Sequence, residues 1–172
     1  VRFGLLKDFP EQSEEDKKLA DPWIESFKAL LWERVNPNKI DTEGEISDEI
    51  IVELRNMGAF ALKIWKRYGG LEFSAANYGR VMTLVGGWDG SMSCLISPPN
   101  SLGIATPIMK IGTNAQQEKY LRELANGKMS AFALTERQAG SDPTRVETVA
   151  TRIYDDDKKI IGYVLNGHKL YT

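Results

Sequence analysis

The hydrophobic residues of this chain change their spacing once, near Met129, and that change limits what the chain can fold into. Before Met129 they recur every three or four positions, as on one face of a helix, for example at Ile50 and Leu54. After Met129 they alternate with polar residues, as in strands. We therefore expect an α+β chain in which an all-α helical domain, residues 1–128, precedes the first strands of an antiparallel β-domain, residues 129–172.

Helix boundary signals divide the first of these domains. Asp21 followed by Pro22 is typical of the start of a helix, and Asn36-Pro37 is expected to end it. The alternative is that residues 13–20 form a turn of the same helix, kinked at Pro22. Thr113, three residues before a glutamine, predicts a capping box at the start of the last helix. Further helices are expected over residues 47–58, 74–85, 89–98, 102–112 and 113–127.

Four strands are expected in the second domain, over residues 129–135, 146–154, 160–165 and 168–172. A charged run at residues 155–159, three aspartates and two lysines, separates the middle two strands. Asn166-Gly167 is a strong signal for a tight hairpin between the last two. The three aspartates lack the alternating ligand spacing of a calcium loop, so we expect a solvated turn there.

Composition excludes several classes of protein. The 22 basic and 24 acidic residues are well mixed, which argues against binding to nucleic acid. The chain has no run of about twenty apolar residues, so no membrane span is expected. The single cysteine, Cys94, can form no internal disulfide and fits a reducing compartment. The chain begins at Val1 rather than methionine, so we expect that it has been trimmed or processed.

Common metal and nucleotide motifs are also missing from the sequence. His168 is the only histidine, so neither a zinc cluster nor a Ser-His-Asp triad is expected. Neither a G-x-G-x-x-G turn nor a P-loop is present. A dinucleotide would therefore have to bind by some means other than a Rossmann turn.

The strongest candidate for chemistry is residues 131–142, Ala-Phe-Ala-Leu-Thr-Glu-Arg-Gln-Ala-Gly-Ser-Asp. An apolar run through Phe132 suits a short buried strand, and Thr135 then places a hydroxyl and a backbone N–H at its end. Gly140 has conformational freedom that lets a ligand approach the main chain, and Ser141 adds a second hydroxyl. The alternative interpretation is a strand followed by an ordinary turn.

Other segments accompany this one in a definite order. They are Asn-Ser-Leu-Gly at residues 100–103, Pro-Ile at 107–108, residues 112–121, and Tyr-Val-Leu-Asn-Gly-His-Lys-Leu-Tyr-Thr at 163–172. In this order and at these separations the segments resemble the acyl-CoA dehydrogenase family of flavoproteins, over roughly residues 40 to 172. The resemblance implies α,β-dehydrogenation of an acyl-CoA thioester, with FAD lying extended against a barrel-like β-domain.

The resemblance also places the family's binding residues on two segments of this sequence. Phe132 matches an aromatic position beside the flavin, and Leu134 and Thr135 match positions that hydrogen-bond the pyrimidine edge of its ring. Ser141 matches a serine near the cofactor's phosphates and the acyl-CoA, and Tyr171 stands where the family usually has tryptophan. The residues expected to bind FAD are Phe132, Ala133, Leu134, Thr135, Gly140, Ser141, Tyr171 and Thr172, and Ser141 is also expected to bind the substrate.

Some positions depart from the family's pattern. Arg137 and Gln138 replace a proline and a second small residue that are common in the family's loop, and Trp65 replaces another proline. Arg137 is expected to be exposed, with a contact to a CoA or FAD phosphate as the alternative. His168 and Lys169 are expected to be solvated rather than catalytic.

The family takes its catalytic base, usually a glutamate, from a C-terminal helical domain, so no residue here, Glu136 included, is expected to be catalytic. We expect the N-terminal portion of an FAD-dependent acyl-CoA dehydrogenase, inactive by itself. The resemblance implies a homo-oligomeric parent in the cytoplasm or the mitochondrial matrix, with an electron acceptor such as an electron-transfer flavoprotein. Two alternatives stay open: an acyl-CoA oxidase or flavin monooxygenase of the same superfamily, and a non-catalytic binding or assembly module.

Overall fold

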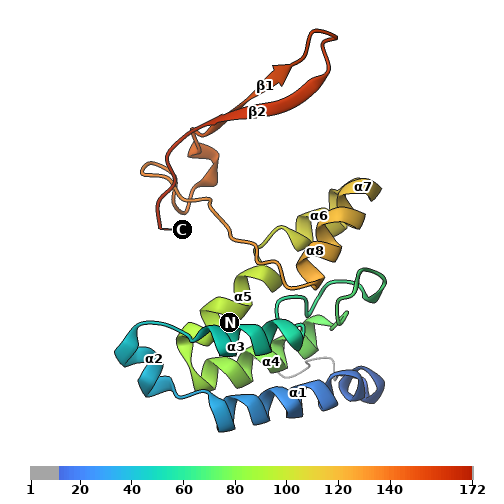
Figure 1. Ribbon diagram of the computed structural model, residues 1–172, viewed down its shortest axis with the longest axis vertical. Helices are drawn as coiled ribbons and strands as arrows, with labels where there is room; N and C mark the ends of the chain where they lie inside the picture. Colours follow the sequence, from blue (N-terminus) through green and yellow to red (C-terminus); the bar gives the residue numbers. More distant parts are fainter. Residues whose placement is uncertain (1–11, 172) are drawn as a thin grey trace, which may run out of the picture. The chain divides into compact units, whose positions relative to one another are not determined.

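The computed structural model describes residues 12–171. The chain divides into two compact units, residues 1–130 and residues 131–172 (Figure 1). Unit 1 is helical, and unit 2 contains a β-hairpin, so the α+β class expected from the sequence is confirmed. The domain limits expected at residues 128 and 129 stay a prediction.

The first helix, α1, spans Glu14–Arg34 and begins earlier than expected. Ser13 caps it, because the Ser13 hydroxyl accepts a hydrogen bond from the Asp16 N–H at 3.2 Å. Asp21 therefore lies inside the helix, so the expected start at Asp21 is wrong and the alternative, in which residues 13–20 belong to the same helix, is confirmed, with Ser13 as its N-cap. Pro22 also lies inside α1, where apolar residues on both sides of it are buried and hold the helix against the core.

The expected helix stop at Asn36-Pro37 is confirmed, since α1 ends at Arg34 with Val35 as its C-cap, and the same two residues also start a second helix. The helix α2 spans Pro37–Glu43, and the Asn36 side chain caps it by accepting a hydrogen bond from the Lys39 N–H at 3.2 Å. Proline suits the first helical position because an N–H there would have no partner in the helix. Gly44 ends α2 with a left-handed φ of 72°.

Three helices begin within one residue of the positions expected from the sequence. They are α3 (Asp48–Asn56), α4 (Ala75–Trp88) and α5 (Gly90–Asn100), preceded by Ser47, Ser74 and Asp89. The cap of α5 is short and charged, since the Asp89 carboxylate accepts a hydrogen bond from the Met92 N–H at 2.6 Å. Pro98 and Pro99 lie in the last turn of α5, so this helix ends close to the expected break.

The last helical stretch of unit 1 changes its hydrogen-bond pattern along its length. After α6 (Ala105–Ile111) come α7 (Asn114–Gln116), the π-helical turn η3 (Gln117–Leu121) and α8 (Arg122–Ala125). The expected capping box is confirmed: the Thr113 hydroxyl accepts from the Gln116 N–H, and the Gln116 side chain accepts from the Thr113 N–H at 2.9 Å. Gly127 follows with a left-handed φ of 88°.

Two apolar cores stabilise unit 1. The larger lies among α1, α3, α4 and α5, in the lower part of Figure 1, and contains Phe27, Leu54 and Val85, each with no exposed surface. The smaller joins α6, η3 and α8 to the connection that contains the 3₁₀ turn η2 (Lys66–Tyr68). Within residues 12–171, no helix combines the length and the apolar character that a membrane crossing needs.

Unit 2 contains one antiparallel hairpin, which follows the 3₁₀ turn η4 (Pro143–Arg145). The strand β1 (Val149–Tyr154) pairs with β2 (Ile160–Asn166), and residues 155–159 form the turn expected between them. The Asp155 carboxylate closes that turn by accepting a hydrogen bond from the Lys159 N–H at 2.7 Å. Every residue of β1 is exposed, its apolar residues included.

Two of the four expected strands do not form within the described residues: 129–135 and 168–171. The chain does not fold back onto β2 after Gly167, because Lys169 and Leu170 form hydrogen bonds to residues 134–136 instead. Gly167 itself packs against Thr148, where a Cβ on the glycine would lie 2.0 Å from the threonine hydroxyl oxygen. The hairpin expected at Asn166-Gly167 is therefore wrong.

Candidate functional site

The segment expected to carry chemistry, residues 131–142, bends sharply after Thr135. Two backbone hydrogen bonds close the bend: the Glu136 N–H donates to the Ala139 carbonyl at 2.9 Å, and the Ala139 N–H donates to the Glu136 carbonyl at 3.2 Å. The bend separates the extended residues 131–135 from Gly140 along the chain. The two parts of the predicted binding loop therefore run in different directions.

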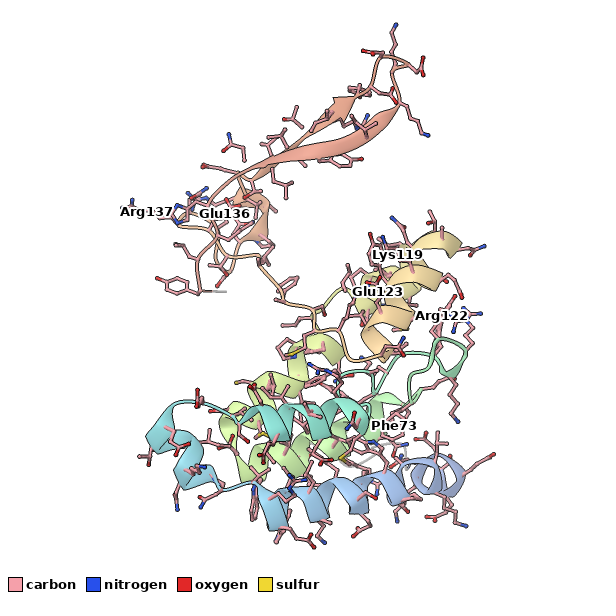
Figure 2. The ribbon with its side chains drawn as sticks, viewed as in Figure 1. Phe73, Lys119, Arg122, Glu123, Glu136 and Arg137 are labelled. Carbon is pink, nitrogen blue, oxygen red and sulfur yellow. The ribbon has the colours of Figure 1, made fainter. Side chains whose placement is uncertain are left out.

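The Glu136 side chain is the centre of the hydrogen bonds at this bend (Figure 2). It is charged, yet only 4% of the residue is exposed. Its carboxylate accepts hydrogen bonds from the N–H groups of Glu147 at 2.7 Å and Thr148 at 3.1 Å, and from the Thr148 hydroxyl. It also pairs with the Lys169 ammonium at 2.7 Å.

These donors decide the protonation state of Glu136. The Lys169 ammonium, then the Thr148 hydroxyl and the Glu147 N–H, lower the pKa of Glu136 from its usual 4.5 to about 2, against the opposing effect of burial. A carboxylate with so low a pKa stays ionised at physiological pH and is a poor proton acceptor. The chemistry of Glu136 therefore fits a fixed anion and does not fit a base.

Lys169 links the bend to the last described residues. Its ammonium group also donates to the Leu134 carbonyl at 3.0 Å, and the neighbouring Leu170 N–H donates to the Thr135 carbonyl at 2.9 Å. We call Glu136, Lys169 and these bonds the Glu136–Lys169 clamp. The expectation that Lys169 is solvated is wrong, because its ammonium group bonds to two oxygen atoms from the bend.

The clamp brings together three of the residues predicted to bind FAD. Leu134 and Thr135 supply carbonyl groups to it, and Tyr171 directly follows Leu170 in the clamped segment. Tyr171 is 94% exposed and has a left-handed φ of 57°, and Phe132 is 47% exposed. Both aromatic rings are therefore open to a ligand.

Within residues 12–171, no hydrogen bond of the clamp involves Ala133, Gly140 or Ser141. Ala133, Gly140 and Ser141 are exposed. Gly140 has no left-handed φ, and a Cβ there would meet nothing within 4 Å, so the conformational freedom expected to matter at Gly140 is not used by this backbone. Thr172 lies outside the described residues.

The donors of the extended segment fit a flavin. Among the described residues, no atom accepts a hydrogen bond from the backbone N–H of Phe132, Ala133, Leu134 or Thr135, or from the Thr135 hydroxyl. A flavin ring carries carbonyl and ring-nitrogen acceptors along its pyrimidine edge, so these donors match its chemistry. Within residues 12–171 no group of three or more His, Cys, Asp or Glu side chains could hold a metal ion.

Arg137 lies on the outer side of the bend. Figure 2 shows its side chain extending away from Glu136, and Arg137 and His168 line an open groove of about 570 Å³ within unit 2. Both residues are exposed, as expected from the sequence. Gln138, the other departure in this loop, donates a hydrogen bond to the Glu136 carboxylate at 3.1 Å.

The residues that organise this site are not predictable from local sequence patterns. Thr148 and Lys169 lie 12 and 33 positions after Glu136, so no local pattern links the three. One signal was available in the sequence. Glu136 and Lys169 carry opposite charges, and they lie in the two segments, residues 131–142 and 163–172, that the resemblance assigns to one FAD site. Pairing the two charges predicts the clamp.

Known proteins are similar in sequence to this chain over both of its units. A family model described as acyl-CoA dehydrogenase, N-terminal domain, matches residues 15–128. The chain is 35% identical over 170 residues to a probable acyl-CoA dehydrogenase, FadE10, of Mycobacterium bovis, and 35% identical over 164 residues to the caffeyl-CoA reductase-Etf complex subunit CarC of Acetobacterium woodii. These alignments cover 99% and 95% of this chain but 25% and 40% of the relatives. The chain thus spans a quarter to two fifths of their length.

Solved structures agree with the sequence relatives. Butyryl-CoA dehydrogenase from Megasphaera elsdenii is 29% identical with a TM-score of 0.69, over 95% of this chain and 42% of that protein. An acyl-CoA dehydrogenase from Bacillus anthracis, solved in complex with FAD, is 25% identical with a TM-score of 0.73, over 94% of this chain and 27% of that protein. The helical unit and the hairpin unit therefore both have counterparts in these solved structures, one of which contains FAD.

Proposed function

The chain belongs to the acyl-CoA dehydrogenase family, and from this premise we propose that it forms the helical domain and the first flavin-binding segment of an enzyme that dehydrogenates acyl-CoA thioesters with FAD. The Glu136–Lys169 clamp is the observation that carries the proposal. It holds the donors of Leu134 and Thr135 beside the segment of Tyr171, although these residues are far apart in the sequence.

The donors have a chemical role in this proposal. When bound, FAD would supply the acceptor for the hydride that leaves the β-carbon of the acyl-CoA. The Thr135 hydroxyl and the N–H groups of Leu134 and Thr135 would hold the flavin ring by donating hydrogen bonds to it, and would stabilise the negative charge that the ring gains on reduction. Because the clamp fixes the segment in advance, the donors need little reorganisation during the reaction.

Glu136 has a positioning role and no catalytic one. Its carboxylate is surrounded by donors, and its pKa is lowered to about 2, so it has little tendency to take the α-proton of a substrate. Replacing it would act on the reaction through the position of residues 134–136. We propose no residue among 12–171 as the base that takes the substrate α-proton.

The partners follow from the family and from the relatives' names. We assign the acyl-CoA to Ser141, which is exposed beyond the bend. The relative from Acetobacterium woodii is named as a subunit of a reductase-Etf complex, which supports an electron-transfer flavoprotein as the electron acceptor. A homo-oligomer in the cytoplasm or the mitochondrial matrix completes the proposal, and the single free cysteine, Cys94, accords with a reducing compartment.

A second candidate is the same chemistry run in the opposite direction. The relative just mentioned is named as a caffeyl-CoA reductase, and its identity to this chain equals that of the probable dehydrogenase. An enzyme of this kind reduces the α,β double bond of an enoyl-CoA. Comparing the rate with a saturated acyl-CoA and an electron acceptor against the rate with an enoyl-CoA and an electron donor separates the two candidates.

The test uses a protein that contains residues 1–172 and retains FAD. Anaerobic mixing with an acyl-CoA should bleach the flavin absorbance at a measurable rate. Thr135→Ala should slow bleaching or weaken FAD retention by about 2 to 4 kcal/mol at most, because one donor to a developing charge is lost. Thr151→Ala, which removes an exposed hydroxyl from β1, is the matched control and should change neither quantity. Equal behaviour of the two variants would remove Thr135 from the site.

A further inference from the structure

Unit 1 carries an arginine stacked on two aromatic rings, far in sequence from the flavin segment. The centre of the Arg67 guanidinium lies 4.3 Å from the centre of the Trp65 ring and 5.0 Å from the centre of the Tyr68 ring. Arg122, the first residue of α8, lies 5.9 Å from the same Tyr68 ring. We call these four residues the arginine–aromatic cluster.

The backbone beneath the cluster is held by several hydrogen bonds. The N–H groups of Tyr68 and Gly70 donate to the Trp65 carbonyl at 2.9 and 3.3 Å. The Glu72 carboxylate accepts from the Lys66 N–H at 3.0 Å, which fixes the start of η2. Gly70 packs so closely that a Cβ would lie 2.2 Å from a backbone carbonyl oxygen. A ligand of Arg67 would therefore bind to a loop that is already ordered, which lowers the entropic cost of binding.

The rings are anchored as well. Tyr68 is buried, and its hydroxyl donates to the Gln117 side chain at 3.2 Å. The Trp65 and Tyr68 rings are stacked, with centroids 6.1 Å apart. Trp65 is half-buried and packs against the smaller core of unit 1. The stacking surface for Arg67 is thus part of the folded unit.

Arg67 differs from Arg122 in how its donors are used. Arg122 pairs with Glu118 at 2.5 Å. Within residues 12–171, no carboxylate pairs with Arg67, whose side chain is exposed. A guanidinium that stacks on aromatic rings keeps its five N–H donors in one plane, and its edge can bind both oxygens of a carboxylate at once. Arg67 is therefore arranged to receive an acidic group from outside this chain.

The charge around the cluster favours the same kind of ligand. Its two segments, residues 63–72 and 117–122, contain five cations, Lys63, Lys66, Arg67, Lys119 and Arg122, and two carboxylates, Glu72 and Glu118. Figure 2 shows Lys119 and Arg122 on the helical stretch that lies beside the connection carrying η2. Both carboxylates are engaged within unit 1. Because the whole chain has a net charge of −2, this positive excess is local.

The shape of the surface distinguishes a protein partner from a small molecule. The hollow beside Arg67 is lined by Trp65, Arg67 and Glu72 and has a volume of about 290 Å³. A site so open and so sparsely lined cannot enclose most of a small ligand's surface. A projecting acidic side chain from another protein needs no enclosure. We propose that the arginine–aromatic cluster is a docking site for a carboxylate-bearing segment of a partner protein, with Arg67 binding the carboxylate.

The test uses the 172-residue chain and a fluorescein-labelled peptide of alternating glutamate and glycine, followed by fluorescence anisotropy. Arg67→Gln should weaken binding about tenfold or more, because a charged hydrogen-bonding group is lost. Arg67→Lys should also weaken it, because lysine keeps the charge and loses the planar fork. Arg152→Gln is the matched control: it removes an equal charge from an exposed position on β1 and should leave binding unchanged.

Three outcomes would overturn the proposal. Equal weakening by Arg67→Gln and Arg152→Gln would show a general attraction between the peptide and any cation of the chain. If Arg67→Lys bound the peptide as tightly as the unchanged chain, the planar guanidinium of Arg67 would have no role in binding. Binding of inorganic phosphate through Arg67, with no binding of the peptide, would replace the protein partner by a small anion. Equal thermal midpoints for the variants and the unchanged chain establish that all are folded.

Discussion

The two units of this chain are stabilised in opposite ways. Unit 1 buries an apolar core in which Phe27, Leu54 and Val85 have no exposed surface. In unit 2 the buried residues among those described are Glu136 and Ala139, and the hairpin exposes its apolar side chains. Apolar burial gives stability that depends little on direction, whereas a buried carboxylate fixes the positions of each donor around it. The predicted flavin segment lies in unit 2, where directional hydrogen bonds to a buried carboxylate, and not apolar burial, hold the chain in place.

The largest expected effect tests the apolar half of this comparison. Phe27→Ala should destabilise unit 1 by about 3 to 5 kcal/mol, because it removes a fully buried aromatic ring and leaves a cavity. Urea unfolding followed by far-ultraviolet circular dichroism measures the change. Val52→Ala is the control, because Val52 is 45% exposed on the neighbouring α3 and its truncation leaves no cavity. A loss in Phe27→Ala no larger than in this control would contradict the core described here.

An intermediate effect is expected from breaking the clamp. Glu136→Gln leaves the Lys169 ammonium without its anion and weakens the bonds from the Glu147 and Thr148 N–H groups. Hydrogen exchange of the Thr148 and Leu170 amides should become about tenfold faster or more, while the amides of α1 stay unchanged. Glu147→Gln, at an exposed neighbouring carboxylate, is the matched control. Unaltered exchange at Thr148 would mean that the carboxylate does not organise unit 2.

The smallest effect comes from acid, because protonation leaves the oxygen atoms of Glu136 in place. The folded-state pKa of Glu136 is lowered to about 2 from its usual 4.5. Its stabilisation of unit 2 is therefore complete above about pH 4.5 and is lost as the pH falls towards 2. The Thr148 amide chemical shift should titrate with a midpoint near pH 2, and Glu136→Gln should abolish this titration.

Unit 1 should respond differently to the same acid. Hydrogen bonds from the Ser74 hydroxyl and the Gln12 amide also lower the pKa of Asp16, at the start of α1. The apolar core does not titrate, so most of the helical circular dichroism should persist while the Thr148 signal moves. Simultaneous loss of both signals would show that the two units depend on the same charges.

Much of unit 1 could be predicted from the sequence because its signals are local. The caps at Ser47, Ser74, Asp89 and Thr113 each lie within a few residues of the helix that they start. The error arose at Pro22, where a start was expected and the packing of α1 carries α1 through the proline. Asn36-Pro37 ends α1 as expected and also starts α2, which was not predicted.

Unit 2 could be predicted only in part, because its decisive contacts are between distant residues. The turn at residues 155–159 and its two strands follow from local signals and are confirmed. The hairpin expected at Asn166-Gly167 fails because Lys169 bonds to residues 134–136, a preference that no short pattern contains. The binding roles of Phe132, Thr135, Ser141 and Tyr171 remain predictions that rest on the resemblance.

The π-helical turn η3 has a consequence for the arginine–aromatic cluster. Such a turn holds one residue more than an α-helical turn, and one residue corresponds to about 100° of rotation about the helix axis. The residues of α8, which follow Leu121, are thereby rotated about the helix axis, and in this orientation Arg122 faces the ring of Tyr68. Deleting one uncharged residue between Gln117 and Leu121 would keep every charge and still turn Arg122 towards another side of the helix. The phase of a single helical turn, more than the number of cations, decides which way the second arginine faces.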